Sequence, residues 1–320
     1  MTENEYKREL KDNLIKYRAS LNLPDDVTFG VEIEYENIPN LNVSYFLDQI
    51  KKSDNLCINW INKRESDLTE YNKWGETMNG EINSPILKDR LDDWKNLSAV
   101  LKLLNEKNGV ITEKCGGHIN IGAHILGKNQ KHWRNFLLLW ILYEKEIYKF
   151  SSGEYSTVRK RDDNTIERIA KELKYNIKSI LKNYRNVYKY LDNVSNCLFY
   201  KCYDLSLDNF NSLNFEINNR IEFRVPNGTL MEEICQNYIN FFAKFVIACK
   251  KELDVEKVLY KIKNNEHTVL ELADYVFDND IDKEYFLIQT LKTNKIYSKK
   301  LQPHIEYVND GDFETHKYFW

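Results

Sequence analysis

Residues 219–229 place charged and apolar side chains in alternation. The apolar residues are Ile221, Phe223 and Val225, and the charged ones are Arg220, Glu222 and Arg224. Because strand side chains alternate between two faces, one face is apolar and the other carries a carboxylate between two guanidinium groups. A carboxylate can bind Mg²⁺, and an arginine can hold phosphoryl oxygens through paired hydrogen bonds. An ion pair on a solvated sheet face is the commoner explanation of one such segment, but three other segments repeat the design.

A second strand is predicted at residues 29–36, with Glu32, Glu34 and Glu36 on its polar face. Residues two apart on one face of a strand lie roughly 7 Å apart, so three carboxylates in a row repel one another unless a cation lies among them. Mg²⁺ and Mn²⁺ prefer carboxylate oxygen and suit this arrangement. The alternative is an acidic edge strand that faces solvent.

A third strand is predicted within residues 115–122, where His118 and Asn120 share the polar face and glycines surround them. A histidine in this setting favours a contact with a metal or a phosphate, although most single histidines are structural. Cys115 precedes the two glycines and is a candidate nucleophile. A small packing residue is the more common role for such a cysteine.

The fourth segment, residues 81–85, places Glu81 and Asn83 on one face at the end of a short strand. Ser84 is predicted to cap the following helix, with Pro85 at its first helical position. The four segments together supply several carboxylates, a histidine and an arginine, which indicates a metal–nucleotide site with more than one divalent ion. This set is poor in sulfur and disfavours zinc. The chain also lacks the glycine motifs of P-loop and Rossmann nucleotide sites.

The ordered set of four motifs resembles the amidoligase family of the carboxylate–amine ligase superfamily, which includes glutamine synthetase and glutamate–cysteine ligase. The motifs are Gly-Val-Glu-Ile-Glu at 30–34, Glu-Ile-Asn-Ser-Pro at 81–85, Cys-Gly-Gly-His-Ile-Asn-Ile-Gly at 115–122 and Ile-Glu-Phe-Arg-Val-Pro-Asn-Gly-Thr-Leu at 221–230. The resemblance covers about residues 28–250. It implies an α+β fold with a glutamine synthetase-like catalytic domain. In that fold an antiparallel sheet has a polar concave face, and helices pack on the other face.

The resemblance also implies roles for individual residues. Metal ligation is expected for Glu32, Glu34, Glu81, His118 and Glu222. ATP contacts are expected for His118, Asn120, Asn214 and Arg224, and direct catalytic roles for Glu34, Glu222 and Arg224. The family often has an aromatic residue or a histidine where this chain has Asn120, which concerns the substrate more than the ATP chemistry.

The activity that the resemblance implies is ATP-dependent ligation of a carboxylate to an amine, with Mg²⁺ or Mn²⁺ as cofactor. The product would be an amide or isopeptide bond, formed through an acyl phosphate on an amino acid, a peptide or a protein. One alternative is a small-molecule phosphotransferase on the same fold. Another is a nucleotide-binding protein without catalytic activity, which the presence of all the expected site residues disfavours.

Composition fits an enzyme of the cytoplasm. The chain has 320 residues, of which 42% are hydrophobic and 30% charged, and its net charge is −3. This charge gives no drive towards nucleic acid, and no apolar run approaches the ~20 residues of a membrane span. Six cysteines without Cys-x-x-Cys spacing indicate reduced thiols. Abundant Lys, Asn, Ile and Tyr are typical of an AT-rich bacterial or phage genome, and the oligomeric state stays open.

The remaining pattern predicts two parts, a catalytic domain at 1–250 and a helical C-terminal extension at 251–320. Apolar residues at helical spacing predict helices within 85–104, 129–150, 166–192 and 230–250. A charged helix is also predicted at 3–20, a helix that covers the sheet at 41–52, and Lys-rich helices at 253–264 and 283–297. A capping box of Thr229 and Glu232 is expected to open the helix at 230. Residues 151–165 are interpreted as a loop, whose Arg159 and Arg161 either close over ATP or form a solvated charge run.

Overall fold

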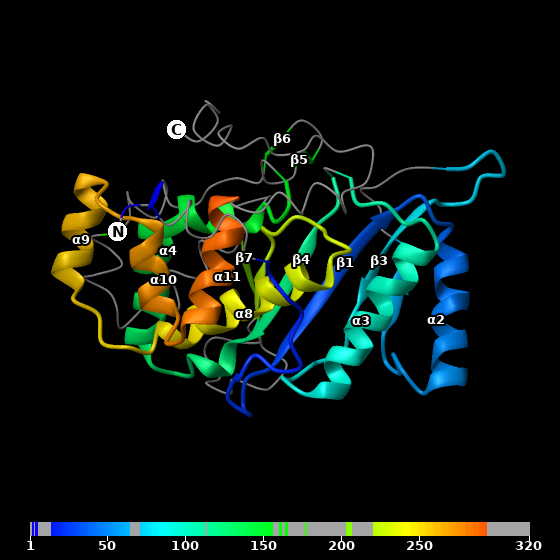
Figure 1. The fold of residues 1–320 in the computed structure, drawn as a ribbon, viewed down its shortest axis with the longest axis horizontal. Coiled ribbons are helices and arrows are strands. Elements are labelled where there is room, and N and C mark those ends of the chain that lie inside the picture. The colour runs from blue at the N-terminus through cyan, green and yellow to red at the C-terminus, as the bar shows by residue number, and fades with distance from the viewer. Residues whose placement is uncertain are drawn as a thin grey trace.

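A six-stranded antiparallel sheet forms the centre of the protein, in the order β2-β3-β1-β4-β8-β7 (Figure 1). The computed structural model describes residues 2, 4–5, 14–64, 71–112, 114–155, 160–161, 164–165, 177, 203–206 and 220–292. The strands are β1 (Phe29–Glu36), β2 (Ile61–Lys63), β3 (Asn79–Asn83), β4 (Gly117–Gly122), β7 (Tyr203–Ser206) and β8 (Arg220–Phe223). Helices cover the sheet, which confirms the α+β class. The glutamine synthetase-like topology and the concave curvature stay predictions.

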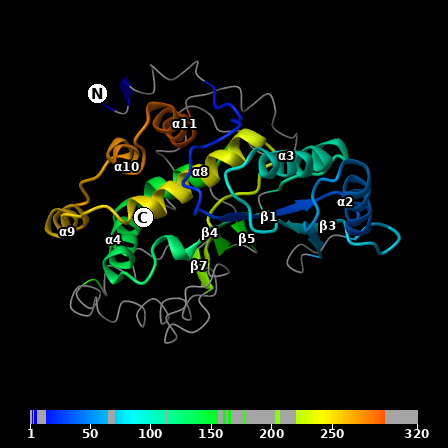
Figure 2. The same ribbon diagram turned by 90° about the horizontal axis from the view of Figure 1, so that it is seen from below.

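Three long helices cover the apolar face of the sheet. They are α3 (Leu91–Glu106), α4 (Gln130–Ser151) and α8 (Glu232–Ala248). Figure 2 shows α3 and α8 on the same side of β1. Trp94 of α3 stacks on Phe29 of β1 at a centroid distance of 5.1 Å, and Trp140 of α4 stacks on Phe223 of β8 at 5.9 Å. The apolar residues of β1, β4 and β8 therefore face the helices and form the core together with Ile82 of β3, as their alternation predicts.

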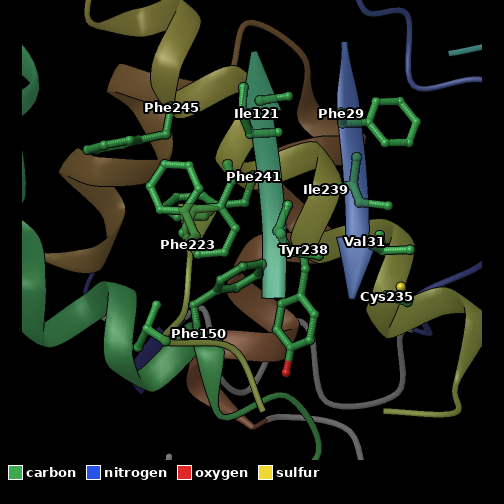
Figure 3. Close-up of a cluster of buried hydrophobic side chains, with 14 of the residues drawn as sticks. Phe29, Val31, Ile121, Phe150, Phe223, Cys235, Tyr238, Ile239, Phe241 and Phe245 are labelled. Atoms are coloured by element: carbon green, nitrogen blue, oxygen red, sulfur yellow. The ribbon is translucent and has the colours of Figure 1, made fainter. Parts of the chain in front are cut away.

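An aromatic cluster joins these helices behind the sheet (Figure 3). Phe241 of α8 is fully buried, and its ring lies 4.7 Å from that of Phe150 and 5.0 Å from that of Phe286. Phe223 of β8 stacks on Phe242 at 4.2 Å. Each aromatic pair at such a separation stabilises the fold by about 0.5–1.5 kcal/mol beyond the contribution of its buried area. The strand that carries Glu222 is thus fixed from behind by packed rings.

The other helices are α2 (Asn40–Asp54), α9 (Val255–Asn264), α10 (Val269–Val276) and α11 (Asp280–Leu291). Helices α9, α10 and α11 pack against α4 or α8 and share one hydrophobic core with the sheet. Among the described helices, none combines the length and the apolar composition that crossing a membrane requires. The division of the chain at residue 250 stays a prediction.

A buried aspartate ties the N-terminal segment to this core. Asp282 of α11 is fully buried and pairs with Lys244 of α8 and with Arg18, whose Nη1 lies 2.8 Å from Asp282 Oδ1. Burial raises the pKa of Asp282, but hydrogen bonds and charges from Lys244, Asn279 and Arg18 outweigh it and hold this pKa below its usual value. The segment around Arg18 is therefore fastened by tertiary ion pairs.

Several helix boundaries differ from the sequence-based expectation. Residues 14–20 are not helical, so the helix predicted at 3–20 is wrong there. The predicted loop 151–165 contains a short antiparallel pair, β5 (Lys160–Arg161) and β6 (Asn164–Thr165). The helix predicted at 283–297 begins at Asp280 and ends at Leu291. Most of the helix predicted at 166–192 lies outside the described residues.

Both predicted N-terminal caps are wrong because their side chains have tertiary partners. Helix α8 begins at Glu232, while Thr229 donates a hydrogen bond to Glu154 and Ser98 donates one to Glu232. Helix α3 begins only at Leu91. Thr229 Oγ1 still accepts a local hydrogen bond of 3.0 Å from Met231 N, but this contact lies before the first residue of the helix.

Ser84 instead extends the sheet where Pro85 interrupts it. Its Oγ accepts a hydrogen bond from Val31 N at 2.9 Å, and its own N–H donates to Val31 O at 2.9 Å. The ladder resumes at Leu87, which exchanges two backbone hydrogen bonds with Phe29. One extra residue therefore fits between the two pairings, as in a β-bulge.

We expect the Ser84→Ala variant to lower the free energy of unfolding by about 1–2 kcal/mol, because the buried Val31 N–H loses its acceptor. Denaturant unfolding followed by circular dichroism measures the change. The Ser53→Ala variant is a suitable control, since Ser53 is exposed near the end of α2 and its hydroxyl donates a hydrogen bond to Gln49 O in the same helix. Equal stabilities of Ser84→Ala and wild type would contradict this assignment.

Candidate functional site

The strand register brings the predicted site residues together on one face of the sheet. Glu32 of β1 lies opposite His118 of β4 on one side and opposite Asn83 of β3 on the other. Glu34 lies opposite Glu81 in the next row. Asn120 and Glu222 are direct partners across β4 and β8. Facing residues of an antiparallel pair lie about 4.5–5.5 Å apart, so four strands contribute to one polar patch.

His118 is the centre of this patch and is 2% exposed. Its Nδ1 lies 3.0 Å from Glu32 Oε2 and 3.5 Å from Glu222 Oε1, and its Nε2 lies 3.6 Å from Glu34 Oε1. Three carboxylates thus converge on one imidazole. Arg220 and Arg224 pair with Glu222, which leaves Glu32 and Glu34 facing one imidazole, so the cluster favours an additional cation.

Glu222 connects the carboxylates of the patch with two arginines. Its Oε1 accepts a hydrogen bond from Arg224, and its Oε2 lies 3.6 Å from Arg220 Nη2. Burial lowers the pKa of Arg224, but the charges of Glu222, Glu32 and Glu34 outweigh this effect and raise its pKa above the ordinary value. Arg224 is therefore a fixed cation, and with a side-chain exposure of 29% it can reach a ligand.

Glu34 is fully buried and is oriented by the backbone of the Gly-Gly turn. Its Oε2 accepts a hydrogen bond of 2.7 Å from Gly116 N. The turn itself packs on the segment after β8, because Gly117 N donates to Pro226 O and Gly228 N donates to Cys115 O. A Cβ on Gly117 would lie 2.7 Å from Asn227 O. These glycines therefore allow the two backbone segments to pack closely.

Glu81 joins the patch from β3. One ligand atom each of Glu32, Glu81 and His118 lie within 4.8 Å of one another, a spacing at which a single metal ion could contact all three. Exposed acidic groups often gather without an ion, but His118 in this group is buried. The site therefore has the side-chain oxygen and nitrogen ligands that a divalent cation requires.

Two of the predicted ATP contacts cannot be placed. Asn214 and Arg159 lie outside the described residues, and only the backbone of Arg161 is described, in β5. The other predicted residues, Glu32, Glu34, Glu81, His118, Asn120, Glu222 and Arg224, occupy the patch or its edge. Their roles stay predictions, whereas their proximity is an observation.

Sequence reasoning missed one residue of the patch, Asn83. The alternation of residues 81–83 puts it on the same face as Glu81, but an asparagine beside a predicted cap carries no metal signal by itself. Only the pairing of β3 with β1 places it opposite Glu32. The missing information was the strand register.

Cys115 behaves as a packing residue rather than a nucleophile. Its side chain is fully buried, and burial together with the charges of Glu36 and Glu34 raises the pKa of the thiol far above its usual range. A nucleophilic cysteine needs an accessible thiolate. The structure thus favours the packing role considered from the sequence.

Glu154 is a further buried carboxyl group, outside the polar patch. Glu154 is 3% exposed, and its Oε1 accepts a hydrogen bond of 2.8 Å from Thr229 Oγ1. Burial raises the pKa of Glu154 to about 7. Burial also lowers the pKa of Lys292 to about 7, so below that pH Lys292 is protonated whether the chain is folded or not.

The raised pKa of Glu154 predicts that the stability of the fold depends on pH. Between about pH 4.5 and pH 7 the folded protein holds a proton on Glu154 that the unfolded chain has released. The free energy of unfolding should therefore fall as the pH rises through this interval. We expect the Glu154→Gln variant to show a smaller fall between pH 5 and pH 7 in denaturant titrations, and the exposed Glu256→Gln control to keep the wild-type fall. Equal pH dependence in Glu154→Gln and wild type would contradict the assignment.

Comparison with known proteins identifies the family. No curated protein matches the chain. Residues 58–246 match the family model described as "putative amidoligase enzyme". This match spans more than half of the 320 residues and includes β3, β4 and β8, which carry Glu81, His118 and Glu222. The chain therefore belongs to the amidoligase family.

Proposed function

We propose that the protein is an ATP-dependent carboxylate–amine ligase that uses Mg²⁺ or Mn²⁺. The observation that carries this proposal is the convergence of Glu32, Glu34 and Glu222 on the buried His118, with Arg224 hydrogen-bonded to Glu222. Clustered carboxylates suit divalent cations, and an adjacent guanidinium suits a phosphoryl group. Family membership supports the same class of reaction.

The ligands of the patch fit a hard divalent cation. Glu32, Glu34, Glu81 and Glu222 offer carboxylate oxygens and His118 offers one imidazole nitrogen, while the thiol of Cys115 beside the Gly-Gly turn is fully buried. A bound divalent cation would neutralise phosphate oxygens and stabilise the charge that develops during phosphoryl transfer. The family resemblance and the oxygen-rich ligands together favour Mg²⁺ or Mn²⁺ over zinc.

The proposed reaction has two steps. A substrate carboxylate oxygen attacks the γ-phosphorus of ATP, the bond from that phosphorus to the β–γ bridging oxygen breaks, and ADP leaves. An amine nitrogen then attacks the carbonyl carbon of the acyl phosphate, the carbon–oxygen bond breaks, and inorganic phosphate leaves while the nitrogen loses a proton.

The side chains of the patch have distinct tasks in this reaction. Arg224 would hold the phosphoryl group during transfer, because a guanidinium can bind two of its oxygens at once. Glu222 orients Arg224 through their hydrogen bond. Asn120 and Gly116 orient Glu32 and Glu34 through hydrogen bonds of 3.0 Å and 2.7 Å. Catalysis would thus rest on fixed positions and electrostatic stabilisation.

The test uses hydroxylamine, a general amine nucleophile that converts acyl phosphates to hydroxamates. The protein is incubated with ATP, Mg²⁺, hydroxylamine and pools of amino acids or peptides. A ligase should form hydroxamate and release ADP and phosphate in equal amounts, and both should depend on the carboxylate pool. ADP release with a stable phosphorylated product would instead identify a phosphotransferase, and no ADP release with any pool would contradict both activities.

A further inference from the structure

Two buried carboxamide oxygens flank Glu32. Asn83 Oδ1 and Asn120 Oδ1 have no hydrogen-bond partner among the described residues. Asn83 lies opposite Glu32 on β3, and Asn120 Nδ2 donates a hydrogen bond of 3.0 Å to Glu32 Oε1 from β4. Burying a carbonyl oxygen without a partner costs about 1–3 kcal/mol. Two such oxygen atoms beside the same carboxylate suggest that both accept from, or coordinate, a ligand bound there.

The orientation of the Asn120 carboxamide follows from its surroundings. Exchange of its nitrogen and oxygen would set Oδ1 against Glu32 Oε1, so that two acceptors would meet at about the hydrogen-bond distance. The amide group therefore faces Glu32, and Oδ1 is the acceptor that stays available. Asn120 is 9% exposed and pairs with Glu222 across the strands.

The neighbours of these oxygens define what they can bind. Glu32 and Glu222 are carboxylates, and carbonyl oxygens next to carboxylates need a cation or a hydrogen-bond donor between them. Carboxylate and carboxamide oxygens with one imidazole form a ligand set typical of hard divalent cations. One ligand atom each of Glu32, Glu81 and His118 already lie within 4.8 Å of one another.

We propose that the carboxamide oxygens of Asn83 and Asn120 complete the coordination of divalent cations at Glu32. This inference rests on the proposed function, because it extends the same site. It assigns to two uncharged residues a role in cation affinity that acidic residues alone would not supply.

The test changes each asparagine in two opposite ways. Leu has nearly the shape of Asn but no ligand oxygen, whereas Asp adds a charged ligand oxygen. Melting temperatures and calorimetric titrations are recorded with Mg²⁺ alone and with Mn²⁺ alone, without ATP. Stabilisation of the folded state grows as RT ln(1 + [L]/Kd), so a change in Kd is visible in both readouts.

We expect Asn83→Leu and Asn120→Leu to weaken cation binding about tenfold or more, and Asn83→Asp and Asn120→Asp to strengthen it. The Asp variants should also be less stable than wild type without cation, since they add buried negative charge. Asn62→Asp is the matched control, because Asn62 lies on neighbouring β2 and bonds to Tyr35 and Asn40 on the other face. It should leave the cation affinity unchanged.

A purely structural role predicts a different pattern, in which both substitutions destabilise the protein and the cation affinity stays that of wild type. This pattern at both positions overturns the inference, and at one position it overturns the role of that asparagine. If wild type binds cation and ATP while the variants match it, the ligase proposal survives alone. If wild type binds neither cation nor ATP, both proposals fail together.

Discussion

The Glu222→Gln variant should lose at least about 10²-fold in the rate of ADP formation, which corresponds to roughly 2.7 kcal/mol or more of transition-state stabilisation. Glu222 contacts His118 and both Arg220 and Arg224, so its charge connects the predicted cation site with the predicted phosphate contact. Gln keeps the shape but removes the charge. The rate is measured in the substrate pool that supports the wild-type enzyme.

The matched control for this variant is Glu232→Gln. Glu232 accepts a hydrogen bond from Ser98 and lies 3.7 Å from Lys102, on helix α8 and away from the polar patch. It should keep the wild-type rate. A folded Glu222→Gln variant with a rate within about threefold of wild type would contradict the role of Glu222.

The Phe241→Ala variant should lose about 3–5 kcal/mol of unfolding free energy. Phe241 is fully buried, stacks on Phe286 with an interplanar angle of 15° and has the rings of Phe150 and Phe242 as further neighbours. Figure 3 shows Phe241 and Phe150 in the buried cluster. These rings are held by separate helices and cannot collapse into the space that Ala would leave. Guanidinium unfolding with a fitted m-value measures the loss.

The control for Phe241→Ala is Tyr260→Ala on α9, where the aromatic side chain is 59% exposed. Loss of an exposed ring should change the unfolding free energy by no more than about 0.5 kcal/mol. A loss below about 1 kcal/mol in Phe241→Ala would show that the helices behind the sheet repack. This result would contradict the conclusion that packed aromatic rings hold β8 in place.

The strands of the site were predictable because their period of two is strong. Val31 and Ile33 in β1 and Ile119 and Ile121 in β4 are all buried, as alternation requires. The polar residues between them must then lie on the opposite face of the sheet. The pattern of each strand therefore determined which face its Glu or His would occupy.

The neighbours of each side chain could not be predicted in the same way. That His118 faces Glu32 while Asn120 faces Glu222 depends on pairing between strands far apart in the sequence. The alternation of a strand determines which face each residue occupies, but it does not determine which residue of another strand lies opposite. Asn83 was missed for this reason.

The wrong helix starts have a related cause. Ser84 and Thr229 are good capping residues by type, but Ser84 Oγ accepts from Val31 N of a distant strand, and Thr229 donates to Glu154 and accepts from Met231 N before the helix begins. Tertiary hydrogen bonds between distant segments outweighed a local preference worth only about 1 kcal/mol. Asn129, Asp254 and Thr268 do cap helices α4, α9 and α10, because their side chains accept from the backbone of the first turn.

The most direct test of the central claim is calorimetric titration of ATP into the wild-type protein, with and without Mg²⁺ or Mn²⁺. We predict saturable binding that requires the divalent cation and disappears in the Glu222→Gln variant, while Glu232→Gln binds as wild type does. Absence of ATP binding by the folded wild-type protein with either cation would contradict the assignment of the polar patch as a metal–nucleotide site.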